Sequence, residues 1–488
     1  MSKRFVRHNL DSVEQVKERY RKFMLDSLDI LSNESENGEE ERAYMIKKDY
    51  EQISTETVER NELLLNVLNQ EKHNVFQLRK QGVIEKYVDL INILRRSKII
   101  SNMDATDLKD FQAQNHQRED VFASETPKLR VLTREDFKMH FVNFGELYES
   151  VNSRLETKKS LDSKNKAFEI VDRIIAGVNF KKLHPGLEIR RVYYGSTVSH
   201  LSTSKSDIDI TLLTNIHFDE REILNFLWKE IQEKRLLADY EHRFTALLHT
   251  GIRVPILDVE LLEFDDDVAI SFSVNNILAA INSKLLELYS NLDPRCQMLA
   301  LLIKIWSKTH KICSAREGYL SSYAYNLMVI NFLQIHKLPI LPSLETLRAG
   351  VEPLFLEITS SSKITFSVQA NFENKIEKIQ DQMARTFGRN ERTLENLLLR
   401  FFKFYKNEKY LEDKVISIKE GKLIRRNSFD LDEYYLYSIE DPFEKHQNPG
   451  HYVAKGSIKA NRILTAMKKS YKLLKEGKLV EIFQPFED

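Results

Sequence analysis

The sequence predicts an α+β protein in which a strand-rich part is followed by a mainly helical part. Four short stretches between residues 190 and 274 read as strands, and residues 275–338 then follow a helical pattern. The first 125 residues are also helical in pattern and rich in charge. A chain of 488 residues is too long for one ordinary core. We therefore expect two or three domains, the first of them a helical N-terminal extension.

The N-terminal extension, residues 1–128, has apolar residues at helical spacing. One such stripe consists of Val13, Val16, Tyr20, Phe23, Met24 and Leu28. Residues 85–100 repeat the pattern. The polar run 101–128 has no clear period, so we expect a linker into the main body.

The strand-rich part is expected to begin with helical residues 133–175. Its four predicted strands cover residues 190–194, 207–213, 252–262 and 268–274. The first of them runs into Gly195 and Ser196.

The helical part ends at Leu338–Pro342, a rigid break that contains two prolines. Residues 343–390 are poorly patterned and indicate an insertion. We expect a helix over 394–405, a short strand over 415–418 and a basic amphipathic helix over 457–479.

The composition limits the class of protein. Lys plus Arg and Asp plus Glu each number 73, which argues against a protein that coats nucleic acid but leaves room for a local basic groove. Cys296 and Cys313 are the only cysteines, so neither a cysteine zinc site nor a disulfide framework is expected. The charged N-terminus lacks a signal-peptide core, and no run is apolar enough to span a bilayer. We expect a cytoplasmic protein, with the nucleus as the alternative.

The strongest chemical signal is Gly195-Ser196 followed by Asp207 and Asp209. Two aspartates at i and i+2 on a strand point to one face, where they can share Mg²⁺ or Mn²⁺ ions about 4 Å apart. Gly195 would let the backbone approach a phosphate, and Ser196 could hold a phosphate oxygen. Asp-x-Asp pairs alone are common on solvated edge strands. The preceding Gly-Ser makes a phosphoryl-transfer site the better interpretation.

Further short motifs follow in order between residues 135 and 488. They are Asp293–Arg295, Leu302–Lys308, Gly318–Met328, Leu338–Pro342, Phe401–Tyr405, Val415–Ile418 and Glu440–Glu444. Together they resemble the terminal uridylyltransferase and noncanonical poly(A) polymerase family, within the DNA polymerase β-like nucleotidyltransferases.

The resemblance implies a two-lobed fold, with a catalytic domain over 129–285 and a nucleotide-recognition domain over 286–488. It also implies template-independent addition of UMP from UTP to RNA 3′ ends by a two-metal mechanism. AMP addition from ATP is the alternative. The resemblance does not cover the extension, residues 1–128, which we expect to bind a partner protein or RNA.

Several side chains are candidates for nucleotide binding. Lys304 and Lys308 lie one helical turn apart and suit a triphosphate, although a solvated basic face is the commoner fate of such a pair. The resemblance implies that Ser322 and Tyr323 contact UTP, with the Tyr323 ring stacking on the base, and that Asn282 contacts the ribose. The alternative for Ser322 and Tyr323 is packing in the core, and the alternative for Asn282 is capping the start of a helix.

The base-reading position is ambiguous. The family often has a histidine a few residues after the motif Glu440–Glu444. Gln447 falls at that position, and His446 precedes it by one residue. Either side chain can donate a hydrogen bond to a uracil carbonyl. The choice between UTP and ATP therefore stays open.

The third metal-binding aspartate of the family is missing. Two alignments place the position at Ala269 or at Ser271, and neither residue can bind a metal as a carboxylate does. Three interpretations remain: a deliberate change at Ala269, a natural pseudoenzyme, or replacement by Asp267 or Asp258. The chain would then be a crippled enzyme, an inactive scaffold subunit of an RNA-processing complex, or an enzyme with a relocated ligand.

Overall fold

The computed structural model describes residues 126–486 apart from 217, 234–243, 251–253, 263–267, 360–364, 427–434 and 444–450. The chain divides into two units, residues 1–108 and 109–488, and all described residues lie in the second. The helices predicted before residue 126 fall outside the described residues, so the partner-binding role of the extension stays a prediction.

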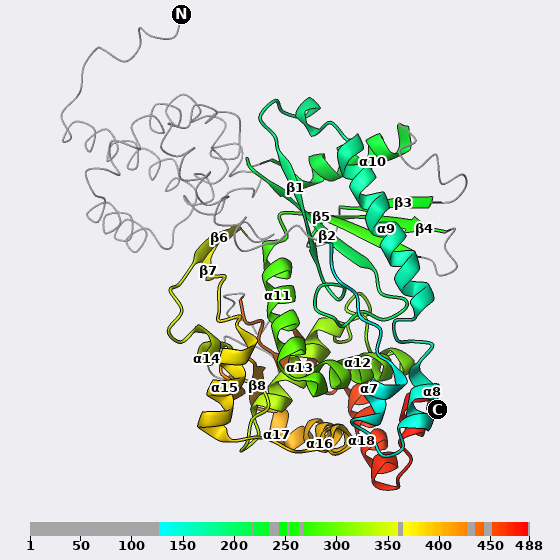
Figure 1. The fold of residues 1–488 in the computed structure, drawn as a ribbon, viewed down its shortest axis with the longest axis vertical. Helices are drawn as coiled ribbons and strands as arrows, with labels where there is room; N and C mark the ends of the chain where they lie inside the picture. The colour runs from blue at the N-terminus through cyan, green and yellow to red at the C-terminus, as the bar shows by residue number, and fades with distance from the viewer. Residues whose placement is uncertain are drawn as a thin grey trace, which may run out of the picture. The chain divides into compact units, whose positions relative to one another are not determined.

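A five-stranded mixed sheet forms the first lobe (Figure 1). Its strands are β1 (Ile189–Tyr194), β2 (Ile208–Thr214), β3 (Phe244–His249), β4 (Ile256–Leu261) and β5 (Val268–Val274). The spatial order is β1-β2-β5-β4-β3, with β2 and β5 parallel and the other pairs antiparallel. The four predicted strands are confirmed. The edge strand β3 was not predicted.

Helices α9 (Lys158–Gly177) and α10 (Glu220–Glu233) pack on this sheet. On β2, Ile208, Ile210 and Leu212 are fully buried in the core that the sheet shares with these helices. Side chains alternate along a strand, so the residues between them point to the opposite face of the sheet. This alternation turns Asp209 away from the core.

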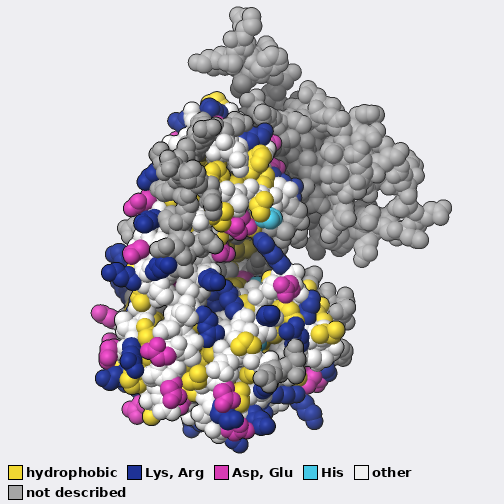
Figure 2. All heavy atoms as spheres, turned by 90° about the vertical axis from the view of Figure 1, so that its right-hand side faces the viewer, with side chains coloured by type: hydrophobic (Ala, Val, Ile, Leu, Met, Phe, Trp, Pro, Cys, Tyr) yellow, Lys and Arg dark blue, Asp and Glu magenta, His cyan; other side chains and the backbone are white. Residues whose placement is uncertain are grey.

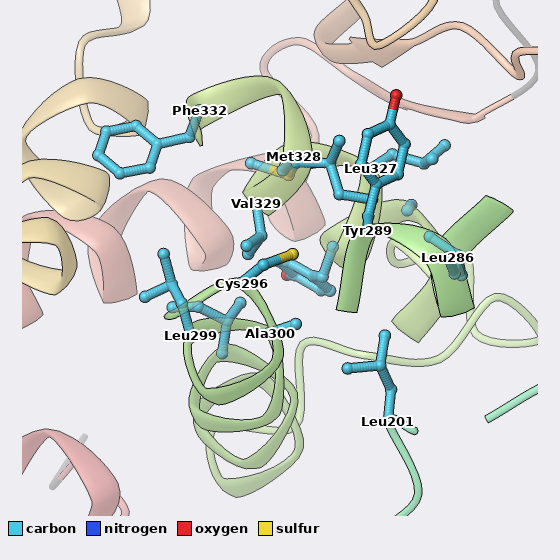
Figure 3. Close-up of a cluster of buried hydrophobic side chains, with 14 of the residues drawn as sticks. Leu201, Leu286, Tyr289, Cys296, Leu299, Ala300, Leu327, Met328, Val329 and Phe332 are labelled. Atoms are coloured by element: carbon cyan, nitrogen blue, oxygen red, sulfur yellow. The ribbon is translucent and has the colours of Figure 1, made fainter. Parts of the chain in front are cut away.

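The second lobe is mainly helical. Its longer helices are α11 (Ile277–Leu292), α12 (Pro294–Thr309), α13 (Ser322–Gln334), α16 (Leu394–Tyr405) and α18 (Ile458–Lys475). The predicted helical stretch 275–338 is therefore three helices, and α16 has the predicted bounds. Tyr289, Cys296, Leu299, Met328 and Phe332 from α11, α12 and α13 meet in one apolar core (Figure 3).

Shorter elements complete this lobe. The helices are α7 (Arg134–Lys138), α8 (Phe144–Val151), α14 (Leu344–Arg348), α15 (Ile376–Phe387), α17 (Glu408–Leu411) and η4 (Val480–Phe483). The short helix η2 (Phe180–Lys182) belongs to the first lobe, where Phe180 is buried in the core of the sheet. The strands are β6 (Phe355–Thr359), β7 (Thr365–Gln369), β8 (Lys414–Ser417), β9 (Lys422–Arg425), β10 (Tyr435–Ile439) and β11 (His451–Ala454). The poorly patterned region 343–390 thus holds two helices and a hairpin. Within the described ranges, no helix is long and apolar enough to cross a membrane.

Candidate active site

Asp207 and Asp209 lie where the chain enters β2, on the face opposite α9 and α10. Asp207 directly precedes the strand, and Asp209 is paired with Tyr194 of β1 on one side and Ser271 of β5 on the other. The intervening Ile208 is fully buried and anchors the segment. The two carboxylates therefore share one face, as the i, i+2 spacing predicts.

The two carboxylates repel each other. Burial raises the pKa of Asp209 to about 7, and the charge of Asp207 adds to the shift. The side chain of Asp207 reaches solvent, but the protein around it shields part of the carboxylate from water. This partial burial raises the pKa of Asp207, the charge of Lys308 opposes the shift, and the charge of Asp258 adds to it. A divalent cation would relieve this repulsion, and oxygen ligands suit Mg²⁺.

The pair therefore fits the metal that the sequence predicts. Within the described residues, no group of three or more His, Cys, Asp or Glu side chains is arranged to hold a metal ion. Asp207 and Asp209 would accordingly hold Mg²⁺ together with nucleotide phosphates and water, which is how this ion is commonly bound.

Gly195 makes room for Asp209. Its φ of 76° is in the left-handed region, and a Cβ there would lie 2.0 Å from the Asp209 Oδ2 atom. The Gly195 N–H donates to the Ser283 hydroxyl of α11 at 2.7 Å, so this donor has a protein partner. Ser196 is half-buried in the turn after β1, and its contact with phosphate stays a prediction.

Lys304 is buried beneath the loop that leads to Asp207. Its ammonium donates to the Leu201 carbonyl at 2.8 Å and to the Ser206 hydroxyl at 2.9 Å. Burial lowers the pKa of Lys304 to about 7, and the charge of Lys308 adds to this. Two of its three donors thus hold the β1–β2 loop in place. Lys308, one turn later on α12, is exposed.

A second group of polar side chains surrounds Asp441. The Tyr323 hydroxyl donates to Asn282 Oδ1 at 2.5 Å and to Asp441 Oδ2 at 3.2 Å. The Asn282 amide also reaches Asp441 Oδ2, at 3.4 Å. The His451 ring meets the Tyr323 ring edge-on, with centroids 5.2 Å apart. Asn282 lies inside α11 and is not its cap, a position that Asn276 occupies.

Asp441 and His451 were not among the predicted site residues. Asp441 stands within the recognised Glu440–Glu444 motif, so that motif could have identified it. His451 has no such signal, because only the return of β11 beside β10 brings it to Tyr323. Ser322 opens α13, and its hydroxyl lies 3.2 Å from the Cys313 sulfur. His446 and Gln447 lie outside the described residues.

The strand register distinguishes between the two positions for the missing carboxylate. Ser271 is the partner of Asp209, whereas Ala269 is two residues earlier on β5 and pairs with Glu260 of β4. Ser271 is therefore the position beside Asp209. Its hydroxyl donates to Asp258 Oδ1 of β4 at 2.6 Å. Asp267 lies outside the described residues.

Two protein-family models match this chain. The central palm domain of the mitochondrial-like poly(A) RNA polymerases matches residues 145–291, which hold the mixed sheet and most of α11. The Cid1 family of poly(A) polymerases matches residues 393–447, from the start of α16 through the Glu440–Glu444 motif.

Individual proteins show the same similarity. Poly(A) RNA polymerase cid11 of Schizosaccharomyces pombe is 26% identical over 59% of this chain and 54% of its own length. Human terminal uridylyltransferase 4 is 31% identical over 54% of this chain but only 16% of its own length. The chain thus spans about half of one relative and less than a fifth of the other.

A solved structure extends the similarity to both lobes. The Cid1 poly(U) polymerase bound to MgGTP superimposes with a TM-score of 0.54 and 26% identity, over 70% of this chain and 98% of the other. The α+β architecture expected from the sequence is confirmed. The assignment of individual nucleotide-binding residues stays a prediction.

Proposed function

This chain belongs to the Cid1 family of poly(A) and poly(U) polymerases, and from that premise we propose that it adds UMP to RNA 3′ ends without a template. The observation that supports this most is the pair Asp207 and Asp209 beside Gly195, on the face opposite α9 and α10 of a sheet that matches the family's palm domain. The pair would hold Mg²⁺ at the reacting phosphate.

The residues around this pair have separate roles in the proposal. Magnesium bound there would neutralise triphosphate charge and make the RNA 3′-hydroxyl a better nucleophile. Lys304 holds the loop before Asp207, and Lys308 adds positive charge where the triphosphate would lie. Figure 2 shows Lys and Arg side chains gathered around the hollow that crosses the middle of one face. Such a rim suits an RNA backbone.

The nucleoside is proposed to bind beside Tyr323. The hydroxyl of this residue donates hydrogen bonds to Asn282 and Asp441. These bonds hold the ring in one orientation, in which a base can stack on it. The His451 Nε2 atom is buried without a hydrogen-bond partner, 3.6 Å from Asp441 Oδ2. With a proton on Nε2 this ring would be a donor, and a donor suits a uracil carbonyl; this is the argument for UTP as the substrate. AMP addition remains the alternative, because relatives of both kinds are similar to this chain.

An incorporation assay tests the function. Full-length chain is incubated with radiolabelled UTP or ATP, Mg²⁺, and an RNA whose 3′ end is either free or 3′-deoxy. We expect at least tenfold more UMP than AMP on the free end, and none on the blocked end. Preferential AMP addition would refute the base choice. No addition of either nucleotide with Mg²⁺ or Mn²⁺ would favour the scaffold alternative.

The Lys308 side chain is predicted to contribute to triphosphate affinity. Lys308→Ala should weaken binding of Mg-UTP about tenfold, or ~1.4 kcal/mol, because one exposed cation near the phosphates is lost. Raising the salt concentration should reduce the difference between the two proteins. Isothermal titration calorimetry measures both effects, with Lys468→Ala on the exposed side of α18 as the control. Equal affinities for the two variants would show that Lys308 is only a surface charge.

A further inference from the structure

We infer that Asp258 of β4 supplies the third carboxylate of this active site, and that Ser271 of β5 positions it. The inference rests on the proposed function, since it concerns the same site. Three observations support it: the register of three neighbouring strands, the contacts of Asp258, and the agreement between the β2–β4 separation and the span of two metal ions with their ligands.

Asp209, Ser271 and Asp258 form one row across the sheet. Asp209 on β2 is paired with Ser271 on β5, and Ser271 is paired with Asp258 on β4. The residues on either side of Asp258, Leu257 and Val259, are fully buried in the core beneath the sheet. Asp258 must then point to the opposite face, which is the face that carries Asp209.

The side chains of Ser271 and Asp258 are complementary, a hydrogen-bond donor beside an acceptor. The Ser271 hydroxyl donates to Asp258 Oδ1 at 2.6 Å, a short bond of the kind that charged acceptors form. An aspartate at 271 would instead place its carboxylate against that of Asp258, and two like charges would repel. A carboxylate on β4 with a hydroxyl on β5 is therefore a consistent alternative to a carboxylate on β5.

The distance from Asp209 to Asp258 suits a pair of ions. Neighbouring strands lie about 4.8 Å apart, so the backbones of β2 and β4 are separated by roughly 9–10 Å. Two ions about 4 Å apart, with bonds of about 2.1 Å on each outer side, span roughly 8 Å. A carboxylate on β2 can thus bind one ion of such a pair while a carboxylate on β4 binds the other. The Asp258 charge already raises the pKa of both Asp207 and Asp209.

The other neighbours of Asp258 leave it able to bind a cation. His249 Nε2 lies 3.3 Å from Asp258 Oδ2, and an Arg316 nitrogen lies 3.9 Å from the same oxygen. A carboxylate offers about four acceptor positions, more than Ser271, His249 and Arg316 use together. No preformed three-carboxylate metal site exists among the described residues, so the ions would bind together with the nucleotide.

Metal binding gives a direct test. Mn²⁺ is titrated into the full-length chain with saturating UTP and no RNA, and free Mn²⁺ is followed by electron paramagnetic resonance. Asp258→Asn should weaken the second Mn²⁺ at least tenfold and slow RNA tailing at least a hundredfold. The control is Glu260→Gln, which removes an exposed carboxylate two residues along the same face of β4 and should match the unaltered chain. Thermal melting checks that both variants are folded.

A swap of positions tests the geometry itself. Asp258→Ser combined with Ser271→Asp moves the carboxylate to β5 and should restore Mn²⁺ binding and tailing that Asp258→Ser alone removes. Two results would overturn the inference: Asp258→Asn behaving like Glu260→Gln, or an inactive unaltered chain that Ser271→Asp alone activates. If Asp209→Asn also leaves Mn²⁺ binding unchanged, the proposed function fails together with the inference.

Discussion

Asp209→Asn is expected to slow RNA tailing by at least a thousandfold, and Asp207→Asn should have a similar effect. The substitution keeps the shape of the side chain but removes the negative charge that would hold Mg²⁺ at the reacting phosphate. A thousandfold loss corresponds to about 4 kcal/mol of transition-state stabilisation. Single-turnover incorporation of labelled UMP, with enzyme in excess over RNA, measures the chemical step.

A matched control exists on the same lobe. Asp162 is an exposed aspartate of α9, the helix that packs on the opposite face of the sheet, so Asp162→Asn should tail RNA at the unaltered rate. The asparagine variants should also melt at or above the temperature of the unaltered chain, because Asn at 209 removes the repulsion between the two carboxylates. A rate for Asp209→Asn within threefold of the control would contradict the assignment of the active site.

Local patterns predicted much of the fold. The strand β5 and the helix α16 have the expected bounds, because each has a strong apolar pattern over its full length. The edge strand β3 was missed, since it alternates between half-buried and exposed residues that include the apolar Leu247. Its assignment depends on the neighbouring β4, which sequence periodicity does not show.

Local patterns also predict some residues of the candidate site, whereas others depend on contacts between distant parts of the chain. Asp207 and Asp209 are two residues apart, so strand geometry alone brings them together. Asp258 joins them only through the β4–β5 register, and Asp441 reaches Tyr323 only through tertiary packing. Binding of the triphosphate by Lys304 stays a prediction. In the structure its burial requires protein partners for the ammonium, which it finds in the Leu201 carbonyl and the Ser206 hydroxyl.

The segment before Asp207 depends on a second buried lysine. Lys164 of α9 is 1% exposed, and its ammonium contacts the buried Glu156 carboxylate, the Ser202 hydroxyl at 2.9 Å and the Thr203 carbonyl at 2.7 Å. Burial lowers the pKa of Lys164, and the Glu156 charge opposes that shift. This cluster ties α9 to the loop that leads into β2.

Lys164→Met is therefore expected to destabilise this unit by about 3–5 kcal/mol. The methionine fills most of the space but leaves the Glu156 carboxylate buried without its cation, which is the costly way to break a buried ion pair. Urea denaturation followed by tryptophan fluorescence measures the loss. The only two tryptophans are Trp228 and Trp306, both in the unit of residues 109–488, so the signal reports this unit within the full chain.

The double variant Lys164→Met, Glu156→Leu separates charge from packing. If the unpaired carboxylate causes the loss, removing it as well should recover most of the stability, since replacing a whole buried pair by apolar residues is often close to neutral. If packing causes the loss, the double variant should be as unstable as Lys164→Met or more so. A loss below about 1 kcal/mol for Lys164→Met would mean that water reaches Glu156 and that the cluster does not hold the loop.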